Sequence, residues 1–179
     1  FNDTVDRIAI RPVAVVYKTF ASQNARRVIS NFFSNVRMPI TIANDVLQGK
    51  PLLALRNTGR FAVNTTVGFL GFLDPASNMR MPPSETDFGV TLARWGVPEG
   101  PYLMLPLFGP TTGRDVFQLP VDSQFSPLAQ YARDHNLKYH FEYFPTAFYL
   151  TTVRASALDA EALLEGSYDP YVFLRDAYR

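Results

Sequence analysis

The chain has 179 residues and a formal net charge of +1, and 47% of its residues are hydrophobic and 14% aromatic. This length suits a single domain, and the near-neutral charge gives no field that would attract nucleic acid. The sequence contains no cysteine, which excludes disulfides, thiolate metal sites and a cysteine nucleophile within it.

Residues 24–37 show the clearest helical periodicity. Their apolar side chains repeat at the spacing of one helical face, which is formed by Ala25, Val28, Ile29, Phe32, Phe33 and Val36. The opposite face carries arginine, serine and asparagine but no acidic residue, and we expect Pro39 to end the helix. Such a helix fits the surface of a soluble core, and its acid-free polar face also fits a helix lying in a lipid interface.

Two further helices are expected next. Residues 41–51 predict a short helix closed by Gly49, and residues 51–72, which start with Pro51, predict a longer helix that Asp74 stops. The middle of the longer helix holds small and polar side chains, which allow close helix packing or line a wet cavity. These residues are Asn57, Thr58, Gly59, Asn64, Thr65, Thr66 and Gly68.

Turn and capping residues divide the rest of the chain. After a loop rich in proline and serine at 75–86, we expect Asp87 to cap a helix that runs to Trp95. Ser126 followed by Pro127 is a typical helix start. Residues 109–125 are expected to be irregular. Residues 136–144 are expected to be helical, although their aromatic side chains alternate as in a strand. Helices are also expected at 150–164 and 171–178.

The segment WGVPEGPYLMLPLFGP (95–110) is apolar, and glycine or proline interrupts it every few positions. We expect it to stay irregular. The charge-free runs at 61–73, 100–113 and 143–153 are all shorter than the about 20 apolar residues that a membrane-spanning helix needs. Several such runs fit either a buried core or a protein sunk part-way into a bilayer.

Patterns typical of catalysis are scarce. The sequence contains no G-x-S-x-G elbow, no H-E-x-x-H motif, no P-loop and no G-x-G-x-x-G motif. Its two histidines, His135 and His140, would point to different faces of a helix, so shared metal ligation is not expected. We expect a protein that is not an enzyme. A lipase-like or acyltransferase enzyme is an alternative, and it would need a nucleophile with a base in reach.

Six stretches follow one another along nearly the whole chain: RPVAVVY (11–17), SNFFSN (30–35), NDVLQGKP (44–51), RFAVNTTVGFLGFLDPA (60–76), DFGVTLARWGVPEGPYLMLPLFGPTTGRD (87–115) and SYDPYVFLRDAY (167–178). In residues and in order they resemble the MlaA/VacJ family of Gram-negative outer-membrane lipoproteins. The resemblance is weak in residues 116–150. The lipidated cysteine at the start of mature family members is missing here, and we expect it, with any targeting segment, to lie upstream.

The resemblance implies an all-α fold, in which residues 1–179 form a single ring-like helical domain sunk in the periplasmic leaflet of the outer membrane, with a central amphipathic channel. It implies that the protein removes misplaced phospholipids from the outer leaflet and passes them to the periplasmic carrier MlaC. Trimeric porins are the implied partners. Phospholipid is the transported ligand, and no cofactor, metal ion or nucleic acid is expected.

A lipid path needs neutral hydrogen-bonding groups in an apolar setting and a cation at its mouth for the phosphate. We expect Asn64, Thr65 and Thr66 to supply the former, and Arg60 and Arg94 the latter. Tyr102, Leu103, Leu105 and Phe108 are expected to present apolar surface across from them. The competing interpretation is that Asn64 and the threonines bond to neighbouring helices and contact no cavity.

Asn31, Phe32 and Phe33 lie in the middle of the first expected helix. We expect this helix to form part of the ring and to set the depth at which the protein sits in the membrane. The alternative function is that of a soluble helical lipid-binding protein of the periplasm, which would keep its apolar cavity internal and remain monomeric without detergent.

Overall fold

The computed structural model describes residues 6–105, 109–134 and 151–155, together with Thr4, Phe148, Leu158, Val172 and Asp176. Most of these residues are helical, and one small sheet accompanies the helices, which confirms the expected all-α class. The elements are a π-helical turn at Asp6–Ile10, α2 (Arg11–Phe20), α3 (Gln23–Leu47), α4 (Pro51–Thr66), α5 (Pro75–Asn78), α6 (Phe88–Arg94), β1 (Tyr102–Leu105), β2 (Gly109–Thr112), a 3-10 turn at Asp115–Phe117, α7 (Gln118–Phe125) and α8 (Pro127–Asp134).

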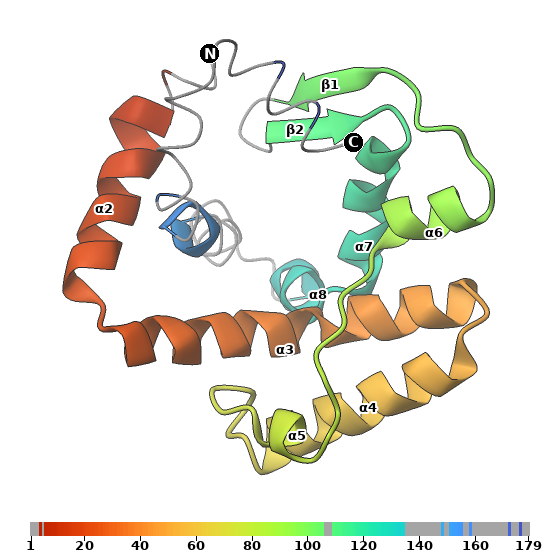
Figure 1. Ribbon diagram of the computed structural model, residues 1–179, viewed down its shortest axis with the longest axis horizontal. Coiled ribbons are helices and arrows are strands. Elements are labelled where there is room, and N and C mark those ends of the chain that lie inside the picture. The colour runs from red at the N-terminus through yellow and green to blue at the C-terminus, as the bar shows by residue number, and fades with distance from the viewer. Residues whose placement is uncertain are drawn as a thin grey trace.

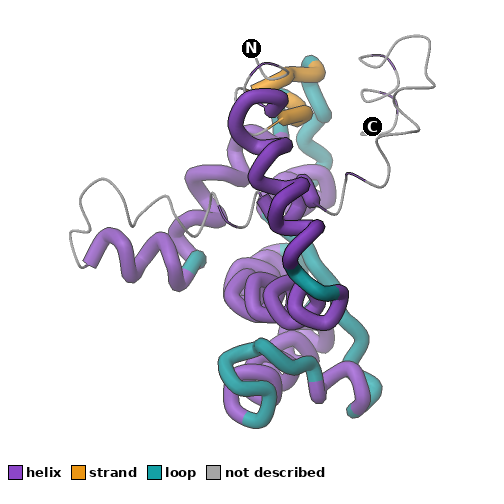
Figure 2. The backbone as a smooth tube through the Cα atoms, turned by 90° about the vertical axis from the view of Figure 1, so that its left-hand side faces the viewer, coloured by secondary structure: helices purple, strands orange, loops and turns teal. Residues whose placement is uncertain are grey.

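Helix α3 is the longest element, and the other elements are arranged around it (Figure 1). Helix α2 rises from one end of α3, and α6 and α7 lie near the other end. The strand pair lies at the top of the view, opposite α3, while α4 packs against the outer side of α3 and α5 packs on α4. Helix α8 runs along the line of sight and projects from one side of the molecule when it is turned (Figure 2).

Helix α3 continues through Pro39 instead of ending before it, so the expected end there was wrong. A proline inside a helix removes one hydrogen bond and costs about 3 kcal/mol. Met38, Ile40 and Thr41 are all buried on either side of it, and this packing offsets the loss. The expected short helix over 41–51 is therefore the last part of α3, which ends at Leu47, with Gly49 at a φ of +68° just beyond.

Several expected helix boundaries are confirmed. Pro51 begins α4, and Ser126 precedes Pro127 at the start of α8. The Asp87 side chain caps α6, because it accepts a hydrogen bond from the Val90 amide at 2.9 Å.

Other boundaries differ. Helix α4 ends at Thr66 and not at residue 72, and turns occupy residues 67–73. The loop expected over 75–86 begins with the short helix α5, which the Asp74 side chain caps by accepting from the Ser77 amide at 3.3 Å. Asp74 thus ends one element and starts the next.

The apolar segment over 95–110 is not irregular throughout, because β1 and β2 pair as an antiparallel hairpin. Tyr102 lies opposite Thr112, and Leu105 lies opposite Gly109. Residues 109–125, also expected to be irregular, contain β2, the 3-10 turn and α7. Of the later expected helices, residues 151–155 are helical, and the segment 136–144 lies outside the described residues, as do His135 and His140.

Hydrogen bonds between polar side chains hold the interior together. The Asn44 Nδ2 donates to Asp122 Oδ1 at 2.9 Å, and the Thr91 hydroxyl donates to Asn44 Oδ1 at 2.7 Å. The Asn57 Nδ2 donates to Asp45 Oδ2 at 2.6 Å. Buried polar groups of this kind are tolerated only when they are paired, so the contacts between α3 and its neighbours are specific.

Large apolar side chains, by contrast, are widely exposed. Phe20 at the end of α2 is 84% exposed and Leu52 at the start of α4 is 81% exposed. Extended apolar surface on a folded protein marks contact with a membrane, a ligand or another protein. No helix among the described residues is both long and apolar enough to cross a membrane.

Candidate functional site

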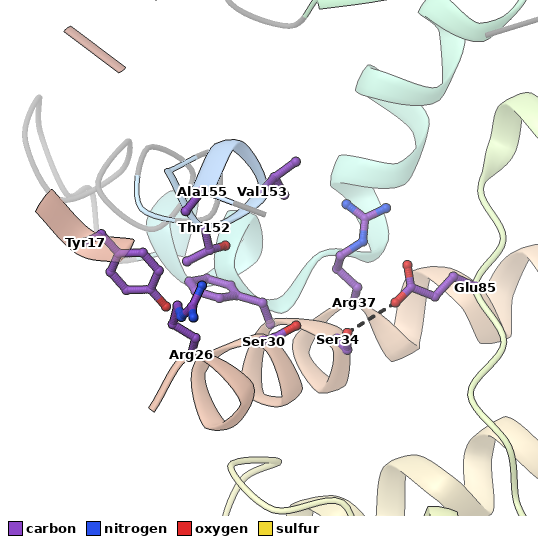
Figure 3. Close-up of a pocket in the computed structure, with 10 residues that line it drawn as sticks. Tyr17, Arg26, Ser30, Ser34, Arg37, Glu85, Thr152, Val153 and Ala155 are labelled. Atoms are coloured by element: carbon purple, nitrogen blue, oxygen red, sulfur yellow. Dashed lines mark hydrogen bonds between the residues drawn. The ribbon is translucent and has the colours of Figure 1, made fainter. Parts of the chain in front are cut away.

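A pocket of about 220 Å³ lies between α2, α3 and residues 151–155 (Figure 3). Polar and apolar side chains line it together. They are Tyr17, Arg26, Ser30, Phe33, Ser34, Arg37, Glu85, Thr152, Val153 and Ala155.

Helix α3 supplies half of this lining from one face. Arg26, Ser30, Phe33, Ser34 and Arg37 follow one another at steps of three or four residues or lie side by side, which places them on one side of a helix. Apart from Phe33 they belong to the polar face of the helix that contains no acid. Part of this polar face therefore lines a pocket of the protein.

Two polar atoms in the pocket have no hydrogen-bond partner among the described residues. These atoms are the Arg26 Nε and the Tyr17 hydroxyl, and both are buried. Burial raises the pKa of Tyr17, while the nearby Arg26 cation opposes this rise. Because buried polar groups are normally paired, an arginine Nε and a phenol hydroxyl left in this state indicate a place for an anionic or hydrogen-bonding ligand.

Other side chains around the pocket contact one another. The Ser34 hydroxyl donates to Glu85 Oε1 at 3.2 Å. The rings of Tyr17 and Phe33 each lie 5.9 Å from that of Phe148, centre to centre, and form an aromatic wall. An arginine and a phenol beside an aromatic wall suit an amphipathic ligand whose charged part is anionic.

A second pocket, of about 370 Å³, lies between α6 and the 3-10 turn. Asp87, Glu99 and Asp115 line it together with Arg114, whose Nε donates to Asp115 Oδ1 at 2.7 Å. Within the described part of the chain, no group of three acidic or histidine side chains is placed to hold a metal ion.

The structure corrects the roles expected for Arg60 and Asn64. Arg60 is only 4% exposed, and its guanidinium donates to Asp74 Oδ2 at 2.6 Å, to Ser77 Oγ at 3.0 Å and to the Met81 carbonyl. The Asn64 Nδ2 donates to Asp74 Oδ1 at 2.9 Å, and its Oδ1 accepts from the Ala76 amide at 3.1 Å.

Both side chains therefore hold the end of α4 against α5, and neither lines one of the two pockets described above. Burial alone would raise the pKa of Asp74, but hydrogen bonds from Ser77, Asn64 and Arg60 hold it below its ordinary value. The competing interpretation, in which Asn64 bonds to neighbouring elements, describes this region correctly.

The other residues expected on the lipid path are scattered. Thr65 is half-buried and its hydroxyl accepts from the Asn35 Nδ2 at 3.0 Å, whereas the exposed Thr66 donates to the Ala62 carbonyl at 2.7 Å. Arg94 is exposed at the end of α6. On the hairpin, Leu103 is exposed and Tyr102 and Leu105 are half-buried, while Phe108 lies outside the described residues.

The three central residues of α3 divide between two surroundings. Phe33 is buried and lines the first pocket. The Phe32 ring stacks on Phe72 at 4.9 Å between ring centres, and the Asn31 Nδ2 donates to the Phe72 carbonyl at 3.4 Å. Asn31 and Phe32 therefore contact the turn at 67–73.

Sequence patterns alone do not mark the pocket residues Tyr17, Arg26, Arg37 and Glu85 as a site. The acid-free polar face of α3 was the signal for the two arginines. Nothing in the sequence indicates that Tyr17 and Glu85 lie beside them, because these two residues reach the pocket from separate elements.

Fold and site together define a class: a mostly helical protein that exposes apolar side chains and holds an amphipathic pocket. The family model of the MlaA lipoprotein matches residues 1–179. The chain is also 36% identical to the intermembrane phospholipid transport system lipoprotein MlaA of Escherichia coli over 183 residues, covering 99% of this chain and 70% of that protein. The chain therefore belongs to the MlaA lipoprotein family.

Two further similarities cover nearly the whole chain. An uncharacterised protein of Rickettsia prowazekii is 35% identical over 179 residues, covering 99% of this chain and 69% of that protein. A solved structure that gives a structural basis for maintenance of bacterial outer membrane lipid asymmetry superposes with a TM-score of 0.82 at 34% identity. The match covers 98% of this chain and 87% of the other.

Proposed function

We propose that this protein removes misplaced phospholipids from the outer leaflet of the outer membrane and passes them to a periplasmic carrier, so that lipid asymmetry is maintained. The observation that carries the proposal is the amphipathic pocket on the acid-free face of α3. Family membership and the phospholipid transport named for the Escherichia coli relative support the same ligand.

In this proposal the phosphate of a lipid contacts Arg26 and Tyr17, which both offer hydrogen-bond donors that no described residue uses. Phe33, Val153 and Ala155 contact its apolar part. Transport requires release, so a pocket in which Glu85 and neutral hydroxyls accompany the two arginines, Arg26 and Arg37, suits the task better than a tight cluster of cations. No bond of the lipid is made or broken.

We further propose that the protein is an outer-membrane lipoprotein that sits in the periplasmic leaflet, ring-like, with the pocket as part of a channel. The arrangement of α2, α3, α7 and the hairpin around the centre of the view is compatible with a ring (Figure 1). The exposed apolar side chains would face lipid. A trimeric porin and the carrier MlaC are the proposed partners.

The test is phospholipid occupancy of the purified protein, measured by mass spectrometry of the extracted lipid. Arg26→Ala should lose most of the bound phospholipid, because the cation beside the phosphate is removed. Arg27→Ala is the matched control, since Arg27 is the next residue along α3 but is exposed and outside the pocket. Equal occupancy in the two variants would contradict the proposed path.

A further inference from the structure

The first pocket holds a carboxylate as well as its two arginines. Glu85 is the only acidic side chain among the described residues that line it, and its Oε1 accepts from the Ser34 hydroxyl at 3.2 Å. Within the described part of the chain, no arginine forms an ion pair with Glu85. The part of α3 that lines the pocket contains no acid, so the negative charge is supplied by a different element.

The loop between α5 and α6 fixes Glu85 in this position. Ser84, the residue before it, donates to Asn57 Oδ1 at 3.2 Å and accepts from Asn57 Nδ2 at 3.0 Å. Thr86, the residue after it, accepts from Gln48 Nε2 at 2.8 Å. Asn57 and Gln48 are both buried. The backbone on either side of Glu85 is therefore anchored, and it presents the Glu85 side chain to the pocket.

Arg26 and Glu85 lie at opposite ends of a polar row on α3, with Ser30 and Ser34 between them (Figure 3). Arg26 and Ser34 are separated by eight helical positions, which corresponds to about 12 Å along the helix axis. One hydrogen bond of about 2.9 Å at each end leaves about 6 Å for the ligand itself. This span suits a phosphate joined to an amine through two carbon atoms.

We propose that Glu85 selects phospholipids whose headgroup carries an ammonium, because its carboxylate accepts a hydrogen bond from that group while Arg26 holds the phosphate. The inference rests on the proposed function, which assigns the phosphate to Arg26. A bond between a carboxylate and an ammonium is stronger than one to a neutral hydroxyl, so an ethanolamine headgroup is favoured over a glycerol headgroup. Since Glu85 is exposed to solvent, which weakens such a pair, the preference should be modest, about threefold.

Competition between two lipids tests this selection. The purified protein is incubated in detergent with equal amounts of phosphatidylethanolamine and phosphatidylglycerol, and the bound lipids are extracted and quantified by mass spectrometry. We expect the ratio of bound phosphatidylethanolamine to phosphatidylglycerol to fall about threefold in Glu85→Gln. Asp134→Asn, an exposed acid of α8 outside the pocket, should keep the ratio of the unchanged protein. A ratio that Glu85→Gln leaves unchanged would overturn the inference, whatever the total amount of lipid bound.

A second competition needs no variant. Phosphatidylcholine keeps the positive charge of phosphatidylethanolamine but has no N–H to donate, so the unchanged protein should bind less of it. Equal binding of these two lipids would overturn the proposed bond to Glu85. The total phospholipid bound reports the proposed function separately, because Arg26→Ala should lower that total. A protein that carries phospholipid without preference overturns this inference alone, and one that carries none overturns both proposals.

Discussion

Helix α3 carries polar side chains towards two regions, and the two regions use them differently. Towards the pocket, Arg26 projects into a cavity in which its Nε has no described partner. Towards the turn at 67–73, Asn31 and Asn35 donate hydrogen bonds to backbone carbonyls. In the pocket, the donors are left unpaired and are available to a ligand. At the turn, the donors pair with the backbone and fix its conformation.

This difference has an energetic consequence. A side chain that pairs with another part of the protein stabilises the fold, and its removal leaves a buried group without a partner. A side chain that waits for a ligand is unpaired before the ligand arrives, so its removal costs the fold little. Substitutions in the two regions should therefore separate stability from lipid binding.

The largest effect on stability is expected where the turn meets α5. Arg60→Ala removes the cation that pairs with Asp74 and leaves that carboxylate without its charge partner. Breaking a buried ion pair from one side costs about 3–5 kcal/mol, so we expect a loss of about 4 kcal/mol in the free energy of unfolding, measured with urea. The exposed Arg27→Ala should change it by about 0.5 kcal/mol at most. A similar value for both variants would contradict the role assigned to Arg60.

The next largest effect concerns the close approach of α3 to the turn. Gly71→Ala forces a Cβ into Asn35 and at the same time into a left-handed backbone, so we expect a loss of about 3 kcal/mol. Gly49→Ala is the matched control, because its φ is also positive but nothing lies within 4 Å of the added Cβ. It should lose about 1 kcal/mol from backbone strain alone. Equal losses would show that α3 does not press on the turn.

In the pocket, we expect a substitution to increase the free energy of unfolding instead of lowering it. Tyr17→Phe removes a buried hydroxyl that has no partner among the described residues, so we expect the free energy of unfolding to rise by about 1 kcal/mol. Phospholipid occupancy of the same variant should fall, since a donor to the phosphate is lost. Calorimetric unfolding in detergent and lipid extraction measure the two quantities. A destabilised variant with full occupancy would place Tyr17 among the structural residues.

Local signals in the sequence predicted the parts of the fold that depend on neighbouring residues. Asp87 as a cap, Pro51 as a helix start and Ser126 before Pro127 all act within one turn of helix, and each is confirmed. The acid-free face of α3 is equally local, because it follows from helical spacing alone. Helical spacing predicted that one side of α3 is polar. It did not predict that this side contributes to a pocket.

The remaining features depend on contacts between distant residues. Pro39 lies inside a helix because burial on both sides of it outweighs the missing hydrogen bond. Arg60 and Asn64 were assigned to a lipid path because charged and polar residues in an apolar run suggest one. Their partner is Asp74, which the sequence identified only as the end of a helix. Hydrogen bonds from Arg60 and Asn64 to Asp74 cross the turn at 67–73, so they cannot be predicted before the conformation of that turn is known.

The smallest effect is a pH dependence that distinguishes two carboxylates. The pKa of Asp74 in the folded protein lies below its ordinary value of 3.8, so the stability it contributes is present above pH 3.8 and is lost as the pH falls through the folded pKa. Burial raises the pKa of Asp122 above 3.8 and Asp87 adds to this rise, although hydrogen bonds from Asn44 and the Phe88 amide oppose it. For Asp122, stability is therefore lost as the pH rises from 3.8 through the folded pKa.

The two groups thus act in adjoining pH windows and with opposite signs. Urea unfolding measured across this range should show a slope below pH 3.8 that disappears in Asp74→Asn and a slope above it that disappears in Asp122→Asn. If Asp74→Asn kept the acid slope, the carboxylate would not be held ionised by Ser77, Asn64 and Arg60. These bonds would then not hold the end of α4 against α5. The turn at 67–73, which connects the two helices, would not be fixed at its base.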